Sequence, residues 1–521
     1  MHDVGEISSQ QRRTRPSHCS APNVPIITGR FHPDTVARAA VRACGRCSAA
    51  MLIMPRRGLL AAALGLFASG RVVRLSTAAA DDAAFPADFV WGASTSSYQI
   101  EGAVDEDGRG KSIWDVYSHT PGMVKNGDTG DVACDHYHRW VEDVEWLARG
   151  GFNAYRFSTA WPRILPAGGG AIEPRGLDFY DRLVDGLITR GVTPWLCLYH
   201  WDLPQALQEQ GGGWLNRDTA DKFADYARIV ARRLGDRVKH WVMFNEANIH
   251  ALFGYGMGGH APGLKGLVNM IRASHHQNLA QGKALSALRA ERADLRLGTV
   301  LNISPVRPSS DSEADHRAVE RFDGFWNGAF LDPLFKGAYP EAVAAEFEPA
   351  VAAGDLKIIR QPVDFFGLNY YAPAWVKEAP ESLSGAWFGA VPAGMRFTAI
   401  GWPVDASGLN DVLVRLRDTY GNPEVYVTEN GACYDDHMAA DGRVADDQRV
   451  TYLREHIAAA RRAIADGVKL KGYFAWSLLD NFEWSEGYSR RFGLIYVDFA
   501  SQKRTPKASF NFLAETVKRR G

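Results

Sequence analysis

The sequence has almost no net charge: its 59 Lys and Arg residues balance 60 Asp and Glu residues, which leaves −1 at pH 7. Such a chain creates no overall field that captures nucleic acid or an acidic membrane surface. Cysteine is also scarce, with six in 521 residues, and only Cys134, Cys197 and Cys433 lie after residue 80. Three cysteines build no disulfide framework. We therefore expect no nucleic-acid partner and a core that is held together by packing.

Several motifs of known chemistry are missing as well. No GxGxxG directly follows any predicted strand, which argues against a dinucleotide cofactor. No GxSxG is present to place a serine nucleophile. The histidines of segment 134–140 open an amphipathic helix, and those of 273–278 have no carboxylate at ligand spacing, so we interpret both sets as surface or packing residues. The sequence predicts neither a metal nor a cofactor.

The first 80 residues differ in composition from the rest of the chain. They hold eleven arginines, no lysine and three acidic residues. Residues 1–53 have no amphipathic period, so they are not expected to fold on their own. We expect a disordered leader there, or an upstream extension that results from a misplaced start codon.

Residues 54–80 are typical of an export signal, of the twin-arginine kind. Arg56 and Arg57 precede an apolar stretch at 58–70, and three alanines at 78–80 suit cleavage. The stretch is too short to span a bilayer, which needs about 20 apolar residues. We expect a periplasmic or secreted protein whose mature chain has no stable membrane association. An uncleaved leader on a cytoplasmic enzyme is the alternative.

From residue 81 to residue 521, short apolar runs that end in polar residues alternate with helix-forming segments. Strands that are apolar on both faces and separated by helices predict a parallel sheet. Eight such runs favour one catalytic domain with the α/β fold of a closed (β/α)8 TIM barrel with long βα loops, over an open doubly wound sheet. The predicted strands are 89–102, 153–161, 193–202, 240–246, 297–306, 364–371, 424–431 and 472–484. Predicted helices with apolar residues at three- and four-residue spacing are 137–150, 177–191, 219–235 and 450–467.

Polar side chains collect where these predicted strands end. In a barrel the carboxyl ends of the strands meet at one mouth, where active sites lie. A single polar residue there could equally be a helix cap or a solvated end, but the pattern recurs in strand after strand. The residues concerned are Gln99, Arg156, His200 and Trp201, Asn245 and Glu246, Asn369 and Tyr371, Glu429, and Glu483 with Trp484.

Two of these carboxylates have neighbours that suggest opposite roles. Glu246, at the rim of an aromatic wall, would lose solvation, which raises the pKa and makes it a proton donor near neutrality. Glu429 follows a strand-forming run and precedes an expected Asn-Gly turn. It would stay ionised if Arg156 and the hydroxyl of Tyr371 were near, since opposite charge and donated hydrogen bonds favour the anion. One acid and one anion are what the cleavage of an acetal requires.

From about residue 85 to about residue 515 the chain resembles glycoside hydrolase family 1, the family of β-glucosidases and β-galactosidases. Four segments carry the resemblance: FVWGASTSSYQIEGA (89–103), FNEAN (244–248), YVTENGA (426–432) and GYFAWSLLDNFEWSEGYSRRFGLIYVDF (472–499). It implies a barrel in which Glu246 is the acid/base, Glu429 is the nucleophile, and hydrolysis proceeds with retention through a covalent glycosyl-enzyme.

The resemblance also implies a sugar-binding set. It places Gln99, His200, Asn245, Glu483 and Trp484 around the hydroxyls of the terminal sugar, with Asn245 on the 2-hydroxyl. Arg156 and Tyr371 would support the nucleophile, Asn369 would line the pocket, and Trp476 would form a platform toward the leaving group, although Trp476 could equally be a core aromatic. Trp161, Trp195 and Trp241 are expected in the core or wall.

The substrate expected from these residues is a small carbohydrate. Glu483 would repel a sugar 6-phosphate, and a carboxylate at Glu246 suits ordinary O-glycosides. Our hypothesis is an exo-acting β-glucosidase acting on disaccharides, short oligosaccharides or aryl glycosides. A non-hydrolytic carbohydrate-binding barrel, a transglycosidase and a β-galactosidase are the alternatives, and the sequence does not rank glucose, galactose and fucose or set the oligomeric state. Segments 260–266, 383–397 and 430–444 are expected to be mouth loops that bind the leaving group.

Overall fold

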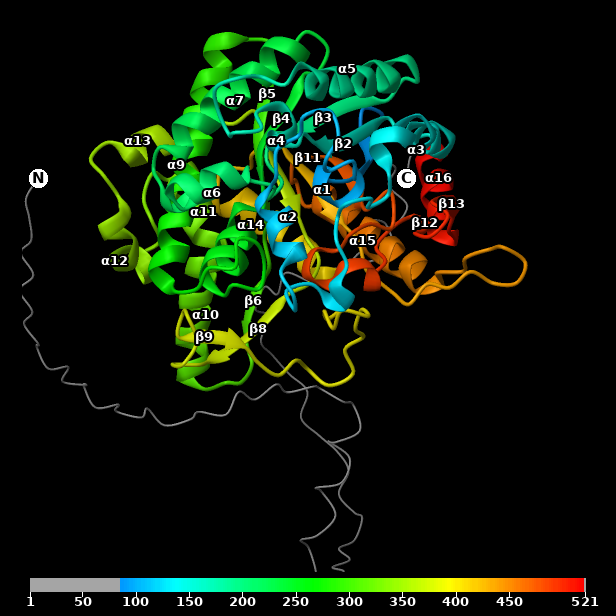
Figure 1. Ribbon diagram of the computed structural model, residues 1–521. Coiled ribbons are helices and arrows are strands. Elements are labelled where there is room, and N and C mark those ends of the chain that lie inside the picture. Colours follow the sequence, from blue (N-terminus) through cyan, green and yellow to red (C-terminus); the bar gives the residue numbers. More distant parts are fainter. Residues whose placement is uncertain (1–84, 520–521) are drawn as a thin grey trace, which may run out of the picture. The chain divides into compact units, whose positions relative to one another are not determined.

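The computed structural model of the protein describes residues 85–519 (Figure 1). In this part of the chain eight strands close a barrel in the order β1-β11-β10-β7-β5-β4-β3-β2, and every neighbouring pair is parallel. The barrel strands are β1 (Val90–Ser94), β2 (Ala154–Ser158), β3 (Thr193–Cys197), β4 (His240–Asn245), β5 (Arg296–Asn302), β7 (Phe365–Asn369), β10 (Val425–Asn430) and β11 (Leu470–Trp476). Each falls within or overlaps one predicted strand, which confirms the predicted barrel. The predictions for residues 1–53 and 54–80 lie outside the described residues.

Helices follow the barrel strands, as the alternation of the sequence predicts. The four helices predicted from periodicity are α3 (His136–Gly150), α5 (Pro174–Thr189), α7 (Thr219–Leu234) and α15 (Asp447–Ala465). The other helices are α1 (Ser97–Ile100), α2 (Ile113–His119), α4 (Trp161–Ile164), α6 (Gln205–Gly211), α8 (Ala247–His250), α9 (Leu267–Glu291), α10 (Glu313–Asp323), α11 (Ala329–Phe335), α12 (Ala344–Phe347), α13 (Asp355–Ile359), α14 (Ser407–Thr419) and α16 (Ala508–Lys518). Short turns of helix are η2 (Lys125–Gly127), η3 (Gly213–Leu215), η4 (Ala251–Gly256), η5 (Gly324–Gly328), η6 (Glu341–Val343), η7 (Glu348–Ala350) and η8 (Trp484–Ser489). Among residues 85–519 no helix combines the length and the apolar character needed to cross a membrane.

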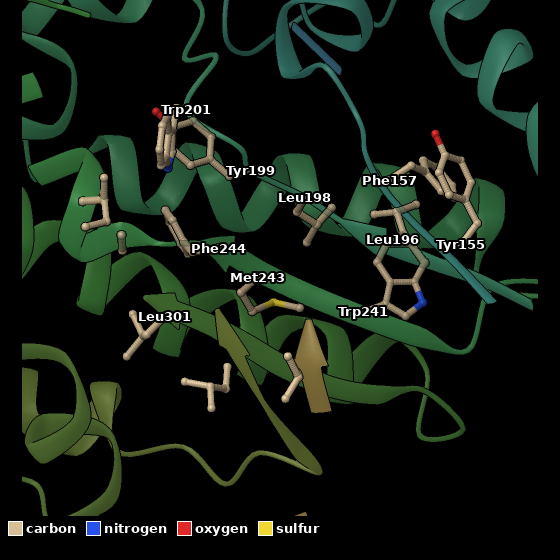
Figure 2. Packing of buried hydrophobic residues seen from close by; sticks show 14 of the residues in the cluster. Tyr155, Phe157, Leu196, Leu198, Tyr199, Trp201, Trp241, Met243, Phe244 and Leu301 are labelled. Atoms are coloured by element: carbon tan, nitrogen blue, oxygen red, sulfur yellow. The ribbon is translucent and has the colours of Figure 1, made fainter. Parts of the chain in front are cut away.

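Side chains alternate between the two faces of the barrel strands, as the two-residue period of a strand requires. Leu196 on β3 and Leu198 directly after it belong to the large apolar cluster that includes the surrounding helices, whereas Trp195 and Cys197 on β3 belong to a separate cluster. Figure 2 shows part of the large cluster, in which Leu196 lies beside Trp241, its partner on the neighbouring strand β4, and Leu198 lies near Met243.

The separate cluster fills the inside of the barrel. It takes one or two side chains from each barrel strand: Val90, Ala154, Trp195, Cys197, Val242, Val300, Phe365, Tyr426 and Phe474. The indole of Trp195 meets the ring of Tyr426 edge-on, with 4.7 Å between ring centroids, and is parallel to the imidazole of His240 at 4.0 Å. This packing makes the barrel interior a solid core and not a channel.

The strand register brings the polar strand ends to one level. Asn302 on β5 is opposite Asn369 on β7, and Asn369 is opposite Glu429 on β10. Further round the barrel, Ser94 on β1 is opposite Trp476 on β11. Residues far apart in the sequence therefore meet at the carboxyl end of the barrel.

Two smaller sheets lie outside the barrel. β6 (Val306–Pro308), β8 (Ala374–Glu378) and β9 (Ala386–Phe388) form one, and the antiparallel pair β12 (Ile495–Asp498) and β13 (Lys503–Pro506) forms the other. In Figure 1, β6, β8 and β9 lie together beside α10. β6 follows β5, and β8 and β9 follow β7, so this sheet is built from loops that leave the carboxyl end of the barrel.

Candidate active site

The carboxyl ends of the barrel strands surround a cavity of about 790 Å³. That volume lies within the range of small-molecule sites, roughly 300–1,000 Å³. The predicted site residues that line it are His200, Asn245, Glu246, Tyr371, Glu429, Trp476, Glu483 and Trp484. Three further predicted residues, Gln99, Arg156 and Asn369, lie behind the wall, and each contacts a lining residue. The structure thus brings the whole predicted set together.

Glu429, near the end of β10, has a cation and a hydroxyl as partners. Nη1 of Arg156 donates to its Oε1 at 2.6 Å, and the hydroxyl of Tyr371 donates to its Oε2 at 2.6 Å. These are the contacts that the sequence predicts. Burial nevertheless raises the pKa of Glu429 above its ordinary value, against the opposing effects of Arg156 and Tyr371. With a guanidinium at its side, Glu429 is still the carboxyl of the site that ionises more readily.

Glu246, directly after β4, has only neutral hydrogen-bond partners. Its Oε1 accepts from Nδ2 of Asn369 at 2.7 Å and from Nδ2 of Asn302 at 3.2 Å. Burial first, and then the charge of Glu429, raise the pKa of Glu246 to about 8. The residue also has a left-handed backbone, with φ of 45°, a conformation that costs a non-glycine residue energy and is concentrated at functional sites. Glu246 therefore holds a proton near neutral pH, as predicted.

Asn245 connects the two carboxyls to His200. Its Oδ1 accepts from Nη2 of Arg156 at 2.7 Å and from Nδ2 of Asn369 at 3.0 Å, which leaves Nδ2 as the donor to Nε2 of His200 at 2.9 Å. Burial, with Arg156 nearby, holds the pKa of His200 well below its ordinary value. A neutral imidazole that accepts at Nε2 carries its proton on Nδ1. That Nδ1 is buried and has no hydrogen-bond partner among the described residues.

Gln99 and Glu483 form a second polar corner of the site. Nε2 of Gln99 lies 3.0 Å from the carbonyl of Phe482 and 3.4 Å from Oε2 of Glu483, and Oε1 of Gln99 accepts from Ser96 at 2.6 Å. Burial, then the charges of the two other glutamates, raise the pKa of Glu483 to about 8. An amide and a carboxyl at one corner suit a polyhydroxylated ligand, since both can bind hydroxyl groups.

Aromatic rings form the floor between these polar groups. The ring of His200 stacks on Trp476 and on Trp484, inclined by 27° and 28°, with 5.7 and 5.8 Å between ring centroids. Trp484 also packs on Trp201 at 4.7 Å, and both tryptophans have left-handed backbones, with φ of 51° and 76°. Trp476 lines the cavity and is 4% exposed, so of the two interpretations of this residue the structure supports the wall of the site.

Some site residues were missed by the sequence analysis. Asn302, the last residue of β5, contacts Glu246 and lines the cavity. The rule that selects polar residues at strand ends would have found it.

The prediction of an Asn-Gly turn after Glu429 is wrong. Asn430 ends β10 with a buried side chain that donates to the carbonyl of Tyr370 at 2.6 Å. Gly431 lies so close to the carbonyl oxygen of Trp476 that an added Cβ would be 1.8 Å from it, so glycine is required there by close approach.

Other expectations have mixed outcomes. Trp161, Trp195 and Trp241 are at most 1% exposed and belong to the core. Of the expected mouth loops, 260–266 and 383–397 contribute lining residues, whereas 430–444 contributes none to the cavity.

The histidines of the two His-rich segments pack inside the protein. His136 is buried, with its Nδ1 2.8 Å from Asp143, and His275 and His276 are buried as well. Within residues 85–519, no group of three or more His, Cys, Asp or Glu side chains is placed to hold a metal ion.

The chemistry of this arrangement follows from the difference between its two central carboxyls. One is paired with a guanidinium, which favours the anion, and the other has neutral partners and a raised pKa, which favours the protonated form. A neutral imidazole, amides and a third carboxyl can bind hydroxyl groups beside them. Such a pair is suited to splitting an acetal between a sugar and its leaving group.

Known proteins with related sequences share this architecture. Residues 81–521 match the family model described as glycosyl hydrolase family 1. Beta-glucosidase A of Thermotoga maritima is 48% identical over 441 residues, which cover 84% of this chain and 98% of that protein. The 1,4-beta-D-glucan glucohydrolase of Thermotoga neapolitana is 47% identical over 441 residues, covering 84% of this chain and 99% of that protein.

A solved structure agrees with both matches. The beta-glucosidase from Thermotoga maritima in complex with glucoimidazole has a TM-score of 0.81 and 47% identity, covering 84% of this chain and 99% of that chain. The family that the four sequence segments resembled is therefore also the family of the matching sequences and of the matching fold. This chain belongs to glycosyl hydrolase family 1.

Proposed function

We propose that the protein is a retaining, exo-acting β-glucosidase that releases terminal β-D-glucosyl residues from disaccharides, short oligosaccharides or aryl glycosides. The observation that carries the proposal is the unequal pairing of the two carboxyls. Glu429 has Arg156 and Tyr371 at 2.6 Å, while Glu246 has only amide donors. The names of the relatives support glucose as the sugar.

In the first step Glu429 attacks the anomeric carbon. The bond from that carbon to the leaving oxygen breaks, and the oxygen takes the proton of Glu246. The products are a glucosyl ester of Glu429, a free alcohol or phenol, and an ionised Glu246. The pKa of about 8 at Glu246 means that the proton is present when the substrate binds near neutral pH.

In the second step water replaces the enzyme at the anomeric carbon. Glu246 takes a proton from the water, the ester bond to Glu429 breaks, and a second inversion restores the original configuration. Formation of the ester removes the negative charge of Glu429, which is one of the two causes that raise the pKa of Glu246. That pKa therefore falls in the intermediate, as the change from acid to base requires.

The remaining residues bind the sugar and position these two groups. Asn245, held by Arg156 and Asn369, is placed to bind the 2-hydroxyl, a contact that strengthens in the transition state. His200 and Glu483, which line the cavity, would bind other hydroxyls, with Gln99 supporting Glu483 from behind the wall. The rings of Trp476 and Trp484 would contact the apolar face of the sugar. Glu483 disfavours a sugar 6-phosphate, because a phosphate there would meet a carboxyl instead of a cation.

The test is a pair of variants measured on glucosides with good and poor leaving groups. Glu429→Gln should abolish turnover of every glucoside. Glu246→Ala should slow natural substrates far more than 2,4-dinitrophenyl β-glucoside, whose leaving group needs no proton, and azide should restore activity as β-glucosyl azide. Glu424→Gln is the control. Glu424 directly precedes the first residue of β10, at the opposite end of the strand from Glu429, and this variant should keep wild-type rates. A 2-deoxy-2-fluoro glucoside should label Glu429 with time. Wild-type rates in both active-site variants would refute the assignment, and a binder without chemistry would show no label.

We also propose that residues 54–80 act as an export signal and that residues 1–53 are not part of the folded enzyme. The support is the arginine pair, the short apolar stretch and the alanines of the sequence. Expression of the full chain in a bacterium, followed by N-terminal sequencing of the protein outside the cytoplasm, tests this. A mature terminus near residue 81 is expected, and an intact cytoplasmic chain would refute it.

A further inference from the structure

The strand that carries Glu429, β10, contains one residue more than its neighbours near its carboxyl end. Val427 lies opposite Leu368 of β7. Glu429, two residues further along β10, lies opposite Asn369, which is only one residue further along β7. The register against β11, on the other side of β10, also shifts in this stretch. The residue left over is Thr428. Such an extra residue forms a β-bulge, which re-aims side chains and is frequent beside active sites.

The bulge holds both polar groups of Thr428 in the interior of the protein. Thr428 is fully buried. Its carbonyl accepts from the hydroxyl of Ser94 on β1 at 2.7 Å, and its own hydroxyl donates to Oδ1 of Asn369 at 2.8 Å. A glycine on β7 makes room for this side chain, because a Cβ at Gly367 would lie 2.9 Å from Oγ1 of Thr428. The hydroxyl is therefore held at one position between β7 and β10.

The direction of the hydrogen bonds around Asn369 is set by Arg156. A guanidinium only donates, so the atom of Asn245 that lies 2.7 Å from Nη2 of Arg156 is its oxygen, Oδ1. The atom of Asn369 that lies 3.0 Å from this oxygen is then the donor, Nδ2. The oxygen of the Asn369 amide must point the other way, where the hydroxyl of Thr428 donates to it. One orientation of this amide satisfies all of these neighbours.

The same orientation decides which oxygen of Glu246 carries the proton. Nδ2 of Asn369 donates to Oε1 of Glu246 at 2.7 Å, and Nδ2 of Asn302 donates to the same oxygen at 3.2 Å. An oxygen that accepts from two donors is the carbonyl oxygen of the protonated acid, which leaves the proton on Oε2. Glu246 lines the cavity, so the proton on Oε2 is free for a leaving oxygen.

Removal of the Thr428 hydroxyl would disturb this arrangement in one direction. Oδ1 of Asn369 would become a buried acceptor without a donor, which is unfavourable. The amide would donate less strongly through Nδ2, since hydrogen bonds in a chain strengthen one another. It would also turn more readily to accept the proton of Glu246 at Oδ1. Both changes favour the protonated acid, and the second binds its proton to the wall of the site.

We infer that Thr428 is a positioning residue for the proton donor: through the amide of Asn369 it keeps Oε1 of Glu246 as an acceptor and leaves Oε2 to protonate the leaving oxygen. The inference rests on the proposed function and adds to it a residue that does not line the cavity. Because Thr428 acts through Asn369 on Glu246, its loss should impair proton donation and not attack by Glu429.

The charged and titratable groups around Glu246 stay the same in variants of Thr428. They are Glu429, Arg156, Glu483, Tyr371 and His200. Burial raises the pKa of Glu483 to about 8, so this carboxyl titrates in the same range as Glu246. The choice of leaving group separates the two, because only the proton of Glu246 makes the rate depend on the basicity of the leaving oxygen.

The experiment compares Thr428→Val, which replaces the hydroxyl with a methyl group, with Thr428→Ser, which keeps the hydroxyl. In Thr428→Val the basic limb of kcat/KM should move toward higher pH by about 0.5–1 unit, a part of the roughly 1–2 units that a whole hydrogen bond to a charged group represents. The acidic limb should stay.

The same variants are measured on phenyl β-glucoside and on 2,4-dinitrophenyl β-glucoside, whose leaving group needs no proton. In Thr428→Val, kcat/KM for the phenyl glucoside should fall at least about fivefold more than for the dinitrophenyl glucoside, a fraction of the roughly 100–10,000-fold that a general acid contributes. Thr428→Ser should behave like the wild type in both measurements.

Thr299→Val is the matched control. Thr299 lies on β5, is fully buried, and its hydroxyl has no hydrogen-bond partner among the described residues. Its replacement should leave the basic limb and the ratio between the two substrates unchanged. An unchanged basic limb in Thr428→Val, or an equal loss with both substrates, would overturn the inference. So would an effect of the same size in Thr428→Ser or in Thr299→Val.

Failure of the inference and failure of the proposed function give different results. Unchanged behaviour of Thr428→Val in an enzyme that hydrolyses glucosides removes only the role of Thr428. If Thr428→Val does not fold, Thr428→Ala removes the same hydroxyl without adding a methyl group, and the same results decide.

A wild-type protein that hydrolyses no glucoside refutes the proposed function. In that case the carboxyl of Glu246 is titrated by NMR with isotope-labelled glutamate, in the wild type and in Thr428→Val, and Glu246→Gln assigns its signal. A higher pKa of Glu246 in Thr428→Val is expected, and equal values would overturn the inference.

Discussion

Replacing Tyr371 with Phe should shift one limb of the pH profile and leave the other in place. The hydroxyl of Tyr371 donates to Oε2 of Glu429 at 2.6 Å, and burial keeps the pKa of this phenol well above its ordinary value, so it remains a donor throughout the working range. The bond favours the ionised form of Glu429 and lowers its pKa. Its removal must therefore raise the pKa of Glu429.

The size of the shift follows from the energy of the bond. A hydrogen bond to a charged group contributes about 1.5–3 kcal/mol, and one pKa unit corresponds to about 1.4 kcal/mol. The acidic limb of kcat/KM, which reports ionisation of Glu429, should move about 1–2 units toward higher pH. The basic limb, which reports loss of the proton from Glu246, should stay, because Glu429 is already ionised there in both enzymes.

The assay is kcat/KM for 4-nitrophenyl β-glucoside between pH 4 and 10, measured by stopping samples in alkali. Tyr434→Phe, a tyrosine that does not line the cavity, is the control and should keep both limbs. An acidic limb that stays or moves to lower pH in Tyr371→Phe would contradict the role of this hydroxyl. A shift confined to the basic limb would mean that the assignments of the two glutamates must be exchanged.

Two further predictions concern backbone approach and buried charge. Gly431→Ala should lower kcat/KM by about a hundredfold. The added Cβ would lie 1.8 Å from the carbonyl oxygen of Trp476 and would displace the end of β10, which carries Glu429, and a displacement near 1 Å has an effect of that size. Near-normal kinetics would contradict this prediction. Lys507→Met should lower the free energy of unfolding, measured by urea titration, by about 3–5 kcal/mol. The buried ammonium of Lys507 lies 2.6 Å from both Asp436 and Asp480, so its removal takes one cationic partner from each of two buried carboxylates. Arg449 lies 2.8 Å from Asp436 and Arg491 lies 2.6 Å from Asp480. A loss below about 1 kcal/mol would show that these two arginines suffice as partners.

The sequence by itself determined the architecture and the main chemical groups. Strand runs that are apolar on both faces, alternating with helical periods, can bury their surfaces only in a parallel sheet covered by helices. Because strands of a barrel end at one mouth, polar residues at strand ends could be assigned to one site without coordinates. Glu246 and Glu429 were found in this way, and the four family segments gave them roles.

Only the tertiary structure decided how those groups behave. Arg156 and Glu429 are 273 residues apart in the sequence, and their contact depends on closure of the barrel and on strand register. The same applies to Asn302 beside Glu246, to the raised pKa of Glu429, and to the burial of the Nδ1 of His200 without a partner among the described residues. The loops at the mouth of the cavity follow no period, so the sequence could mark segment 383–397 as a mouth loop but could not orient Phe388 and Phe397 within it. Pairing, burial and charge are properties of distance, and distance across a barrel is set by the fold as a whole.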